Sequence, residues 1–185
     1  MIKQKEYARR RRQLMRRAGT GSIVILQAAP ARIRNNDAHY AYRQDSDFLY
    51  LTGFPEHDAL LVLLPDEGEG RSILFCRERD PTREMWDGRM VGLESAVADY
   101  GMDEAWDIKE AETRLRDMLP DRERIFHDLG RDPMFDQRLI GWLNEFRGTS
   151  RKTFHAPEEI HALHDMLHDM RVYKSREELS VMRNS

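Results

Sequence analysis

The strongest constraint on the fold is an unbroken apolar run at residues 59–64, which reads ALLVLL. A run of this length without alternating polar positions is typical of a strand that is buried on both faces. Residues 23–26, 72–76 and 125–127 are further short, largely apolar stretches that suit strands. Because such strands need cover on both sides, we predict an α/β fold. Its mixed sheet should have about five or six strands, with helices on both faces.

Segments with helical periodicity separate these strands. The acidic turn at residues 65–70 joins two of the strands, which predicts an antiparallel hairpin. Trp106 falls in a predicted loop or short strand. The predicted helices cover residues 3–17, 94–100, 108–119, 133–148 and 157–170. A further helix is expected to start at Pro81, with Asp80 as its cap.

Composition narrows the classes of protein to which the chain can belong. The 185 residues are 40% hydrophobic and 34% charged, which indicates a soluble globular domain. No apolar run approaches the roughly 20 residues of a membrane helix, and no apolar signal segment follows the arginines at the start. Cys76 is the only cysteine, so a disulfide within the chain is excluded and a buried strand position is expected. Together these features favour the cytoplasm and no membrane partner.

The net charge of −3 hides an uneven distribution. Residues 1–20 carry eight Lys or Arg and one Glu, a balance of +7, so the remainder of the chain carries −10. Such a basic segment suits either nucleic-acid binding or a solvated helix face. Tyr7, Leu14 and Met15 form an apolar stripe between the arginines, and no aromatics are interleaved for base stacking. We therefore interpret the arginines as a solvated face and predict no nucleic-acid partner.

The densest motif of the chain is residues 40–54, which contain five aromatic residues and two aspartates. Asp45 or Ser46 can cap a short helical turn, and Gly53 can end it in a left-handed conformation. Phe48, Leu49 and Leu51 are then expected to face inward.

This motif resembles the signature of the amino-terminal domain of aminopeptidase P, in the creatinase and prolidase superfamily. The matching residues are Tyr42, Arg43, Gln44, Ser46, Asp47, Phe48, Tyr50, Thr52, Gly53 and Phe54. A preceding loop is similar to the family through Arg34, Asn35, Asn36 and Asp37, and a later segment through Arg79, Asp80, Glu84, Trp86, Gly88 and Arg89. The resemblance implies the same α/β domain that the strand pattern predicts.

The resemblance also implies an activity that this chain does not carry by itself. Family members release the residue that precedes proline, using two divalent metal ions, usually manganese, held in a second, pita-bread domain. None of those ligand motifs occurs in this chain, so we expect no catalytic residue, metal ligand or cofactor here. Two alternatives remain: a prolidase-type domain for dipeptides, and a non-enzymatic scaffold domain.

Three residues are candidates for contact with a Xaa-Pro peptide, all by resemblance. Trp86 matches a tryptophan that reaches into the active site, often that of a neighbouring subunit. Asp37 matches an acidic residue near the amino end of the substrate. Arg151 is placed by a weaker alignment, and a surface role suits it equally. For Trp86 the alternative is that it covers apolar surface of its own domain.

The predicted helix at residues 157–170 carries His161, His164 and His168. Histidines three and four residues apart share a helix face, so a metal site is geometrically feasible. The sequence lacks a paired His-Glu-x-x-His arrangement, and we therefore interpret these histidines as a solvated face.

The last segment predicts a boundary. Ser175 and Glu178 have the spacing of a capping box. Together with Arg171 and Lys174 they are similar to the family segment that leads into the catalytic domain. We therefore expect an amino-terminal domain at residues 1–172, and a linker with the start of a helix at residues 173–185. The expected partners are the chain's own catalytic domain and neighbouring subunits of a homo-oligomer.

Overall fold

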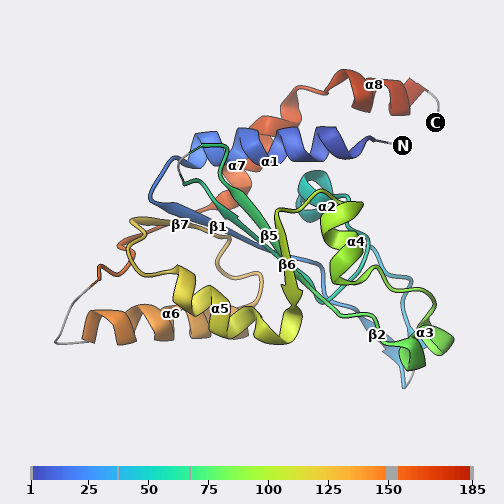
Figure 1. Cartoon of the computed structure of the whole chain (residues 1–185), viewed down its shortest axis with the longest axis horizontal. Helices are drawn as coiled ribbons and strands as arrows, with labels where there is room; N and C mark the ends of the chain where they lie inside the picture. The colour runs from blue at the N-terminus through green and yellow to red at the C-terminus, as the bar shows by residue number, and fades with distance from the viewer. Residues whose placement is uncertain (1, 37, 67, 149–153, 184–185) are drawn as a thin grey trace.

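A six-stranded mixed sheet forms the centre of the computed structural model, which describes residues 2–36, 38–66, 68–148 and 154–183 (Figure 1). The strand order is β6-β5-β4-β1-β7-β8. Strand β4 is antiparallel to both of its neighbours, whereas β1–β7, β7–β8 and β5–β6 are parallel pairs. The strands are β1 (Ser22–Gln27), β4 (Leu60–Leu64), β5 (Arg71–Cys76), β6 (Glu104–Asp107), β7 (Arg124–Phe126) and β8 (Glu159–His161).

The apolar run of β4 contributes to both sides of the sheet, as predicted. All five of its residues are buried. Leu61 and Leu63 pack in one core cluster, and Leu60, Val62 and Leu64 pack in the other. Since successive side chains of a strand point to opposite faces, only a sheet covered on both sides can bury this run.

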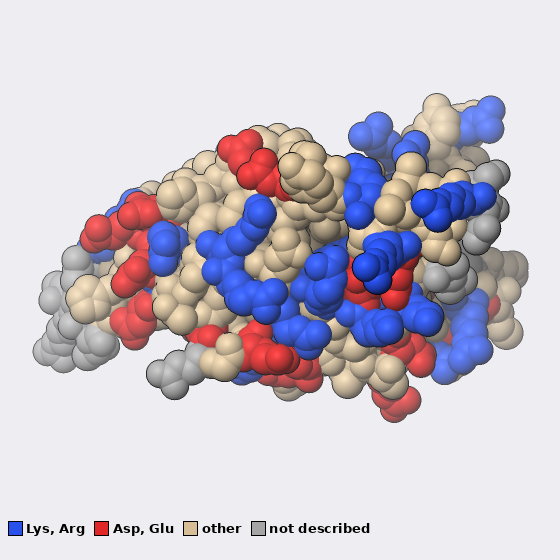
Figure 2. Space-filling model, turned by 90° about the horizontal axis from the view of Figure 1, so that it is seen from above, with Lys and Arg blue, Asp and Glu red and all other residues tan. Residues whose placement is uncertain are grey.

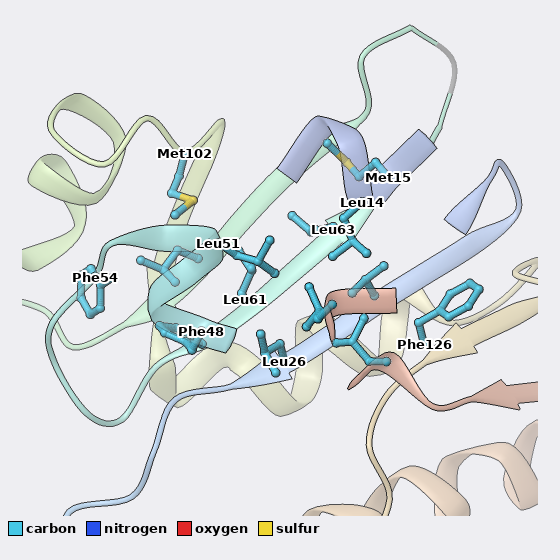
Figure 3. Packing of buried hydrophobic residues seen from close by; sticks show 14 of the residues in the cluster. Leu14, Met15, Leu26, Phe48, Leu51, Phe54, Leu61, Leu63, Met102 and Phe126 are labelled. Carbon is cyan, nitrogen blue, oxygen red and sulfur yellow. The ribbon is translucent and has the colours of Figure 1, made fainter. Parts of the chain in front are cut away.

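Helices cover both faces of the sheet, which confirms the predicted α/β architecture (Figure 1). In Figure 3, Leu51 of α2 lies over Leu61, and Leu14 of α1 lies over Leu63. One face is covered by α1 (Gln4–Ala18), α2 (Ser46–Thr52), α4 (Gly92–Ala98) and α7 (Leu163–Val172). The other is covered by α5 (Ala111–Met118) and α6 (Pro133–Gly148).

Four smaller elements lie outside these layers. The ribbon of β2 (Ile33–Asn35) and β3 (Ala38–His39) and the helix α3 (Pro81–Asp87) lie toward the same end of the long axis (Figure 1). A short turn of 3-10 helix, η1 (Ile108–Glu110), precedes α5. The last helix, α8 (Arg176–Arg183), lies near the start of α1, where the amide of Lys3 donates a hydrogen bond to Glu177 (3.1 Å).

The local signals in the sequence are reproduced at most helix ends. The carboxylate of Asp45 caps α2 by accepting hydrogen bonds from the amides of Asp47 and Phe48, both at 2.9 Å. Gly53 ends the helix with φ +66°, in the left-handed region. The prediction that the apolar side chains of this helix face inward is correct for Phe48 and Leu51. It is wrong for Leu49, which is 42% exposed. In a helix of two turns, neighbouring apolar residues cannot all face the same side.

The predicted helix at residues 157–170 is wrong at its start. Residues 159–161 form β8, which pairs in parallel with β7, and the helix begins at Leu163. His161 therefore lies on an edge strand and shares no helix face with His164 and His168. A strand of three residues is too short for its period to be distinguished from that of the helix that follows.

In the part of the chain that the structure describes, no helix is long and apolar enough to cross a membrane.

The interpretation of the α1 arginines as a solvated face is wrong for two of them. Arg10 and Arg11 are only 1% and 2% exposed. Arg11 donates hydrogen bonds to the carbonyl oxygens of Leu51 (3.0 Å) and Gly101 (2.5 Å). Burial lowers the pKa of Arg11 to about 10, so the side chain stays protonated at neutral pH.

Other basic residues on this side of the molecule are exposed and lie among carboxylates (Figure 2). Arg9 pairs with Glu6 at 2.7 Å, and Arg12 pairs with Glu69 at 3.2 Å. A surface that neutralises its own charge in this way attracts a polyanion weakly.

Replacement of Arg11 tests the importance of the buried guanidinium. In Arg11→Met, the carbonyl oxygens of Leu51 and Gly101 lose their donor, and the Leu51 oxygen is buried. We expect the free energy of unfolding in urea to fall by about 2–4 kcal/mol. Arg16→Met, at an exposed position of the same helix, should change it by less than about 0.5 kcal/mol. Equal effects of the two substitutions would contradict the assigned role of Arg11.

Candidate functional site

Large apolar side chains are exposed at the end of the molecule formed by β2, β3 and α3. Ile33 and Tyr40, within and beside the ribbon, are 66% and 58% exposed. Met85 and Trp86 of α3 are 76% and 84% exposed. We refer to these four residues as the Trp86 end. Large exposed aromatic and aliphatic side chains that lie close together are typical of contact surfaces.

The helix that carries Trp86 is held by polar contacts on its other side. Asp80 caps the helix by accepting a hydrogen bond from the amide of Thr82 (2.9 Å). Arg79 donates two hydrogen bonds to Glu84, at 2.8 and 2.9 Å. Glu84 also accepts a hydrogen bond from the amide of Met90 (3.0 Å). The Arg79 guanidinium and the Met90 amide lower the pKa of Glu84 to about 2, so the pair stays ionised across the physiological range.

The chain that follows α3 is fixed by a second carboxylate. Glu56 accepts a hydrogen bond from the amide of Val91 (2.7 Å) and pairs with Arg77 at 3.4 Å. Gly92 has φ +74°, and a Cβ atom at this position would collide with the side chain of Arg79. The segment therefore has anchors on both sides of Trp86, while the indole itself projects from the surface. The alternative that Trp86 covers apolar surface of its own domain is wrong.

The other two predicted peptide contacts, Asp37 and Arg151, lie outside the described residues. Asn36, the described residue before Asp37 in the chain, has a positive φ of 45°.

Of the three histidines considered as metal ligands, His161 lies on a different element from the other two, whose ring centroids are 5.6 Å apart. His161 pairs with Glu159 at 2.6 Å and stacks on Phe126 with ring centroids 5.1 Å apart. His164 pairs with Asp128 at 2.8 Å. Among the described residues there is no group of three or more His, Cys, Asp or Glu side chains that could hold a metal ion.

The side chain of Gln44, in the family signature, forms its hydrogen bonds with groups of its own domain. The Gln44 side-chain oxygen accepts hydrogen bonds from the amides of Ala29 and Asp45 and from the hydroxyl of Tyr42, each at 2.9 Å. Its amide nitrogen donates to the carbonyl oxygens of Phe54 (3.2 Å) and Glu56 (2.8 Å). With all its polar atoms engaged, Gln44 joins the loop after β1 to the two ends of α2. Its role is structural.

A polar hollow of about 490 Å³ lies between the loops that follow β1 and β7. The carboxyl ends of the two parallel strands meet here, which is where open α/β sheets commonly bind ligands. Arg131 pairs in this hollow with Asp45 (3.2 Å) and Asp128 (3.6 Å). The hollow was not predicted from the sequence, although charged residues directly after the predicted strand at 125–127 were an available signal. Arg131 compensates the charges of Asp45 and Asp128 within it.

Asp128 and His164 stabilise each other's charged forms. Burial alone favours the neutral carboxyl, but hydrogen bonds from the His164 amide and ring, together with Arg131, lower the pKa of Asp128. The hydrogen bond to Asp128 raises the pKa of His164. The pair thus joins α7 to the loop that follows β7.

Comparison with known proteins places these features in a family. The family model described as "Aminopeptidase P, N-terminal domain" matches residues 7–126. The Xaa-Pro aminopeptidase of Escherichia coli (strain K12) is 36% identical over 185 residues, which cover 100% of this chain and 42% of the relative. Xaa-Pro aminopeptidase 3 of Homo sapiens is 31% identical, with 98% of this chain and 37% of the relative covered.

Solved structures agree with this result. Aminopeptidase PepP of Pseudomonas aeruginosa has a TM-score of 0.91 and 48% identity, covering 98% of this chain and 41% of that one. A zinc-substituted E. coli aminopeptidase P in complex with product has a TM-score of 0.91 and 36% identity, covering 99% and 42%. The chain therefore spans about two fifths of the length of these relatives.

The exposure of Trp86 leads to a prediction about stability. Because its indole is 84% exposed, Trp86→Ala should shift the melting temperature of the 185-residue chain by less than about 2 °C. Phe48→Ala is the matched aromatic control: this residue is fully buried, and its loss should cost about 3–5 kcal/mol. A large drop in melting temperature for Trp86→Ala would assign Trp86 to the core.

The pair of His164 and Asp128 leads to a prediction about pH. A raised imidazole pKa contributes stability below the ordinary value of 6.5, which is lost as the pH rises through the raised pKa. His164→Gln should therefore lower the melting temperature more at pH 5.5 than at pH 9. Equal losses at the two pH values for His164→Gln would contradict the ion pair.

Proposed function

Because the chain belongs to the aminopeptidase P amino-terminal domain family, we propose that it is the non-catalytic first domain of a Xaa-Pro aminopeptidase. Such an enzyme releases the amino-terminal residue that precedes proline. The family match and the coverage of about two fifths of each relative support this proposal. In it, residues 1–172 form the domain, and residues 173–185 lead toward the part of the enzyme that performs the reaction.

The donor set of this chain does not fit the two divalent metal ions that the family implies. Hard divalent ions need several free carboxylate oxygens around one point. The described carboxylates of the hollow are instead engaged: Asp45 with Arg131, Asp128 with His164, and Asp132 with Gln27 and the amides of Met134 and Phe135. Cys76 is no alternative ligand, because burial raises the pKa of its thiol to about 12. We therefore assign no metal ligand to this chain and place the ions, manganese by resemblance, in the catalytic domain.

The contribution of this domain to catalysis is assigned to the Trp86 end. The observation that carries this assignment is an indole that is 84% exposed on a helix anchored from behind. Exposed tryptophan on a rigid support concentrates binding energy when a partner covers it. In our proposal Trp86 contacts the peptide at the rim of an active site, in its own chain or in a neighbouring subunit of a homo-oligomer. By resemblance, Asp37 and Arg151 contribute to the same rim. A cytoplasmic location is part of the proposal.

The test uses the enzyme that contains this chain together with its catalytic domain, supplied with Mn²⁺. Wild type should cleave Xaa-Pro peptides, and Trp86→Ala should lower kcat/KM for peptides longer than a dipeptide by about tenfold. Val97→Ala changes another exposed apolar residue, on α4, and should leave kcat/KM unchanged.

Each result has a separate meaning. An inactive wild-type enzyme would contradict the proposed reaction and favour a scaffold domain. Activity restricted to dipeptides would favour a prolidase. An active enzyme in which Trp86→Ala has unchanged kcat/KM would contradict the role of Trp86 alone.

A further inference from the structure

The last turn of α7, after which the chain leads into α8, is bound by α2, the helix of the family signature. The hydroxyl of Tyr50 donates a hydrogen bond to the carbonyl oxygen of Met170 (3.2 Å). Asp47 pairs with Arg171 at 2.5 Å, and the carboxylate of Asp47 is almost fully buried. Two consecutive residues in the last turn of α7, Met170 and Arg171, are thus fixed by one turn of α2.

Arg10 connects the same turn to α8. Its guanidinium lies 4.1 Å from the ring centroid of Tyr50, and it donates a hydrogen bond to the Tyr50 carbonyl oxygen (2.9 Å). In the part of the chain that the structure describes, its Nε and one terminal nitrogen have no hydrogen bond. These nitrogens instead face the carboxylates of Glu6 (3.4 Å) and Glu178 (3.5 Å).

A buried cation with incompletely bonded nitrogens strongly favours a nearby anion. Arg10 is 1% exposed, so water cannot replace the carboxylate of Glu178. The position of Glu178 is therefore coupled to that of Arg10, in the core of the helical layer.

Helix α8 lies at the surface of the domain. None of its described residues is buried, and Leu179 and Met182 are 41% and 63% exposed. A helix of about two turns without a packed face is not stable by itself. The ion pair with Arg10 and the hydrogen bond between Lys3 and Glu177 attach its first turn to the start of α1.

We propose that Arg10, Asp47, Tyr50, Arg171 and Glu178 form an exit clamp that fixes the direction in which α8 leaves the domain. These are positioning residues: through α8 they set where the Trp86 end stands relative to a catalytic domain. This consequence for catalysis rests on the proposed function, whereas the clamp itself is a property of the 185-residue chain.

The substitution Glu178→Gln isolates the ion pair. Glutamine retains the capping box, in which Glu178 accepts a hydrogen bond from the amide of Ser175 (2.8 Å). It removes only the charge that faces Arg10. Glu177→Gln is the matched control. It removes the same charge from the same first turn, keeps a side-chain oxygen that can accept the hydrogen bond from the Lys3 amide, and affects no ion pair with Arg10 among the described residues.

Amide hydrogen exchange on the 185-residue chain measures the clamp. Glu178→Gln should speed exchange at residues 179–183 by about tenfold relative to Glu177→Gln, because removing the anion that faces a buried cation costs at least that factor. The melting temperature should remain close to that of wild type, since α8 buries no side chain. Equal exchange in the two variants would overturn the clamp.

Kinetics of the enzyme with its catalytic domain test the positioning role. Glu178→Gln should lower kcat/KM for longer peptides by about fivefold, while Glu177→Gln should not. Unchanged kcat/KM for Glu178→Gln, despite faster exchange of α8, would overturn the positioning role. An inactive wild-type enzyme would overturn the proposed function, and the exchange comparison would still decide the clamp.

Discussion

The burial of two adjacent arginines of α1 is the interaction on which the rest of this domain depends. A buried guanidinium needs partners, and here the acceptors are backbone carbonyl oxygens at the end of α2 and after α4. Arg10 and Arg11 thereby add polar links between helices that also share one hydrophobic cluster. The same requirement recruits Glu178 and brings α8 against the domain.

Much of the fold could be predicted because its signals are local. The run at residues 60–64, the hairpin with β5 and the caps at Asp45 and Asp80 each depend on a few neighbouring residues. The buried arginines could not be predicted, because a run of four arginines does not indicate which two face inward and arginine is seldom buried. Strand β8 was missed because three residues carry no period.

The candidate site was predicted in part. The exposure of Trp86 followed from the charged residues and glycines around it, which suit a core poorly. The hollow between the loops after β1 and β7 could not be predicted in detail, since it joins segments about a hundred residues apart. Residues 42–54 carry the resemblance to the family, and their contacts are structural. Gln44 binds backbone groups around α2, while Asp47 and Tyr50 bind the last turn of α7. The family signature therefore supports the fold, and the exposed end of α3 carries the surface that we propose contacts the peptide.

Residues 42–54, the family signature, hold the domain together through hydrogen bonds, and substitutions at two neighbouring positions test this role. Gln44 makes five hydrogen bonds within the domain, while Arg43 is exposed and makes none among the described residues. The measurement is the free energy of unfolding in urea. Gln44→Ala should lower it by about 2–4 kcal/mol, and Arg43→Ala should change it by less than about 0.5 kcal/mol. Equal small effects at both positions would contradict the claim.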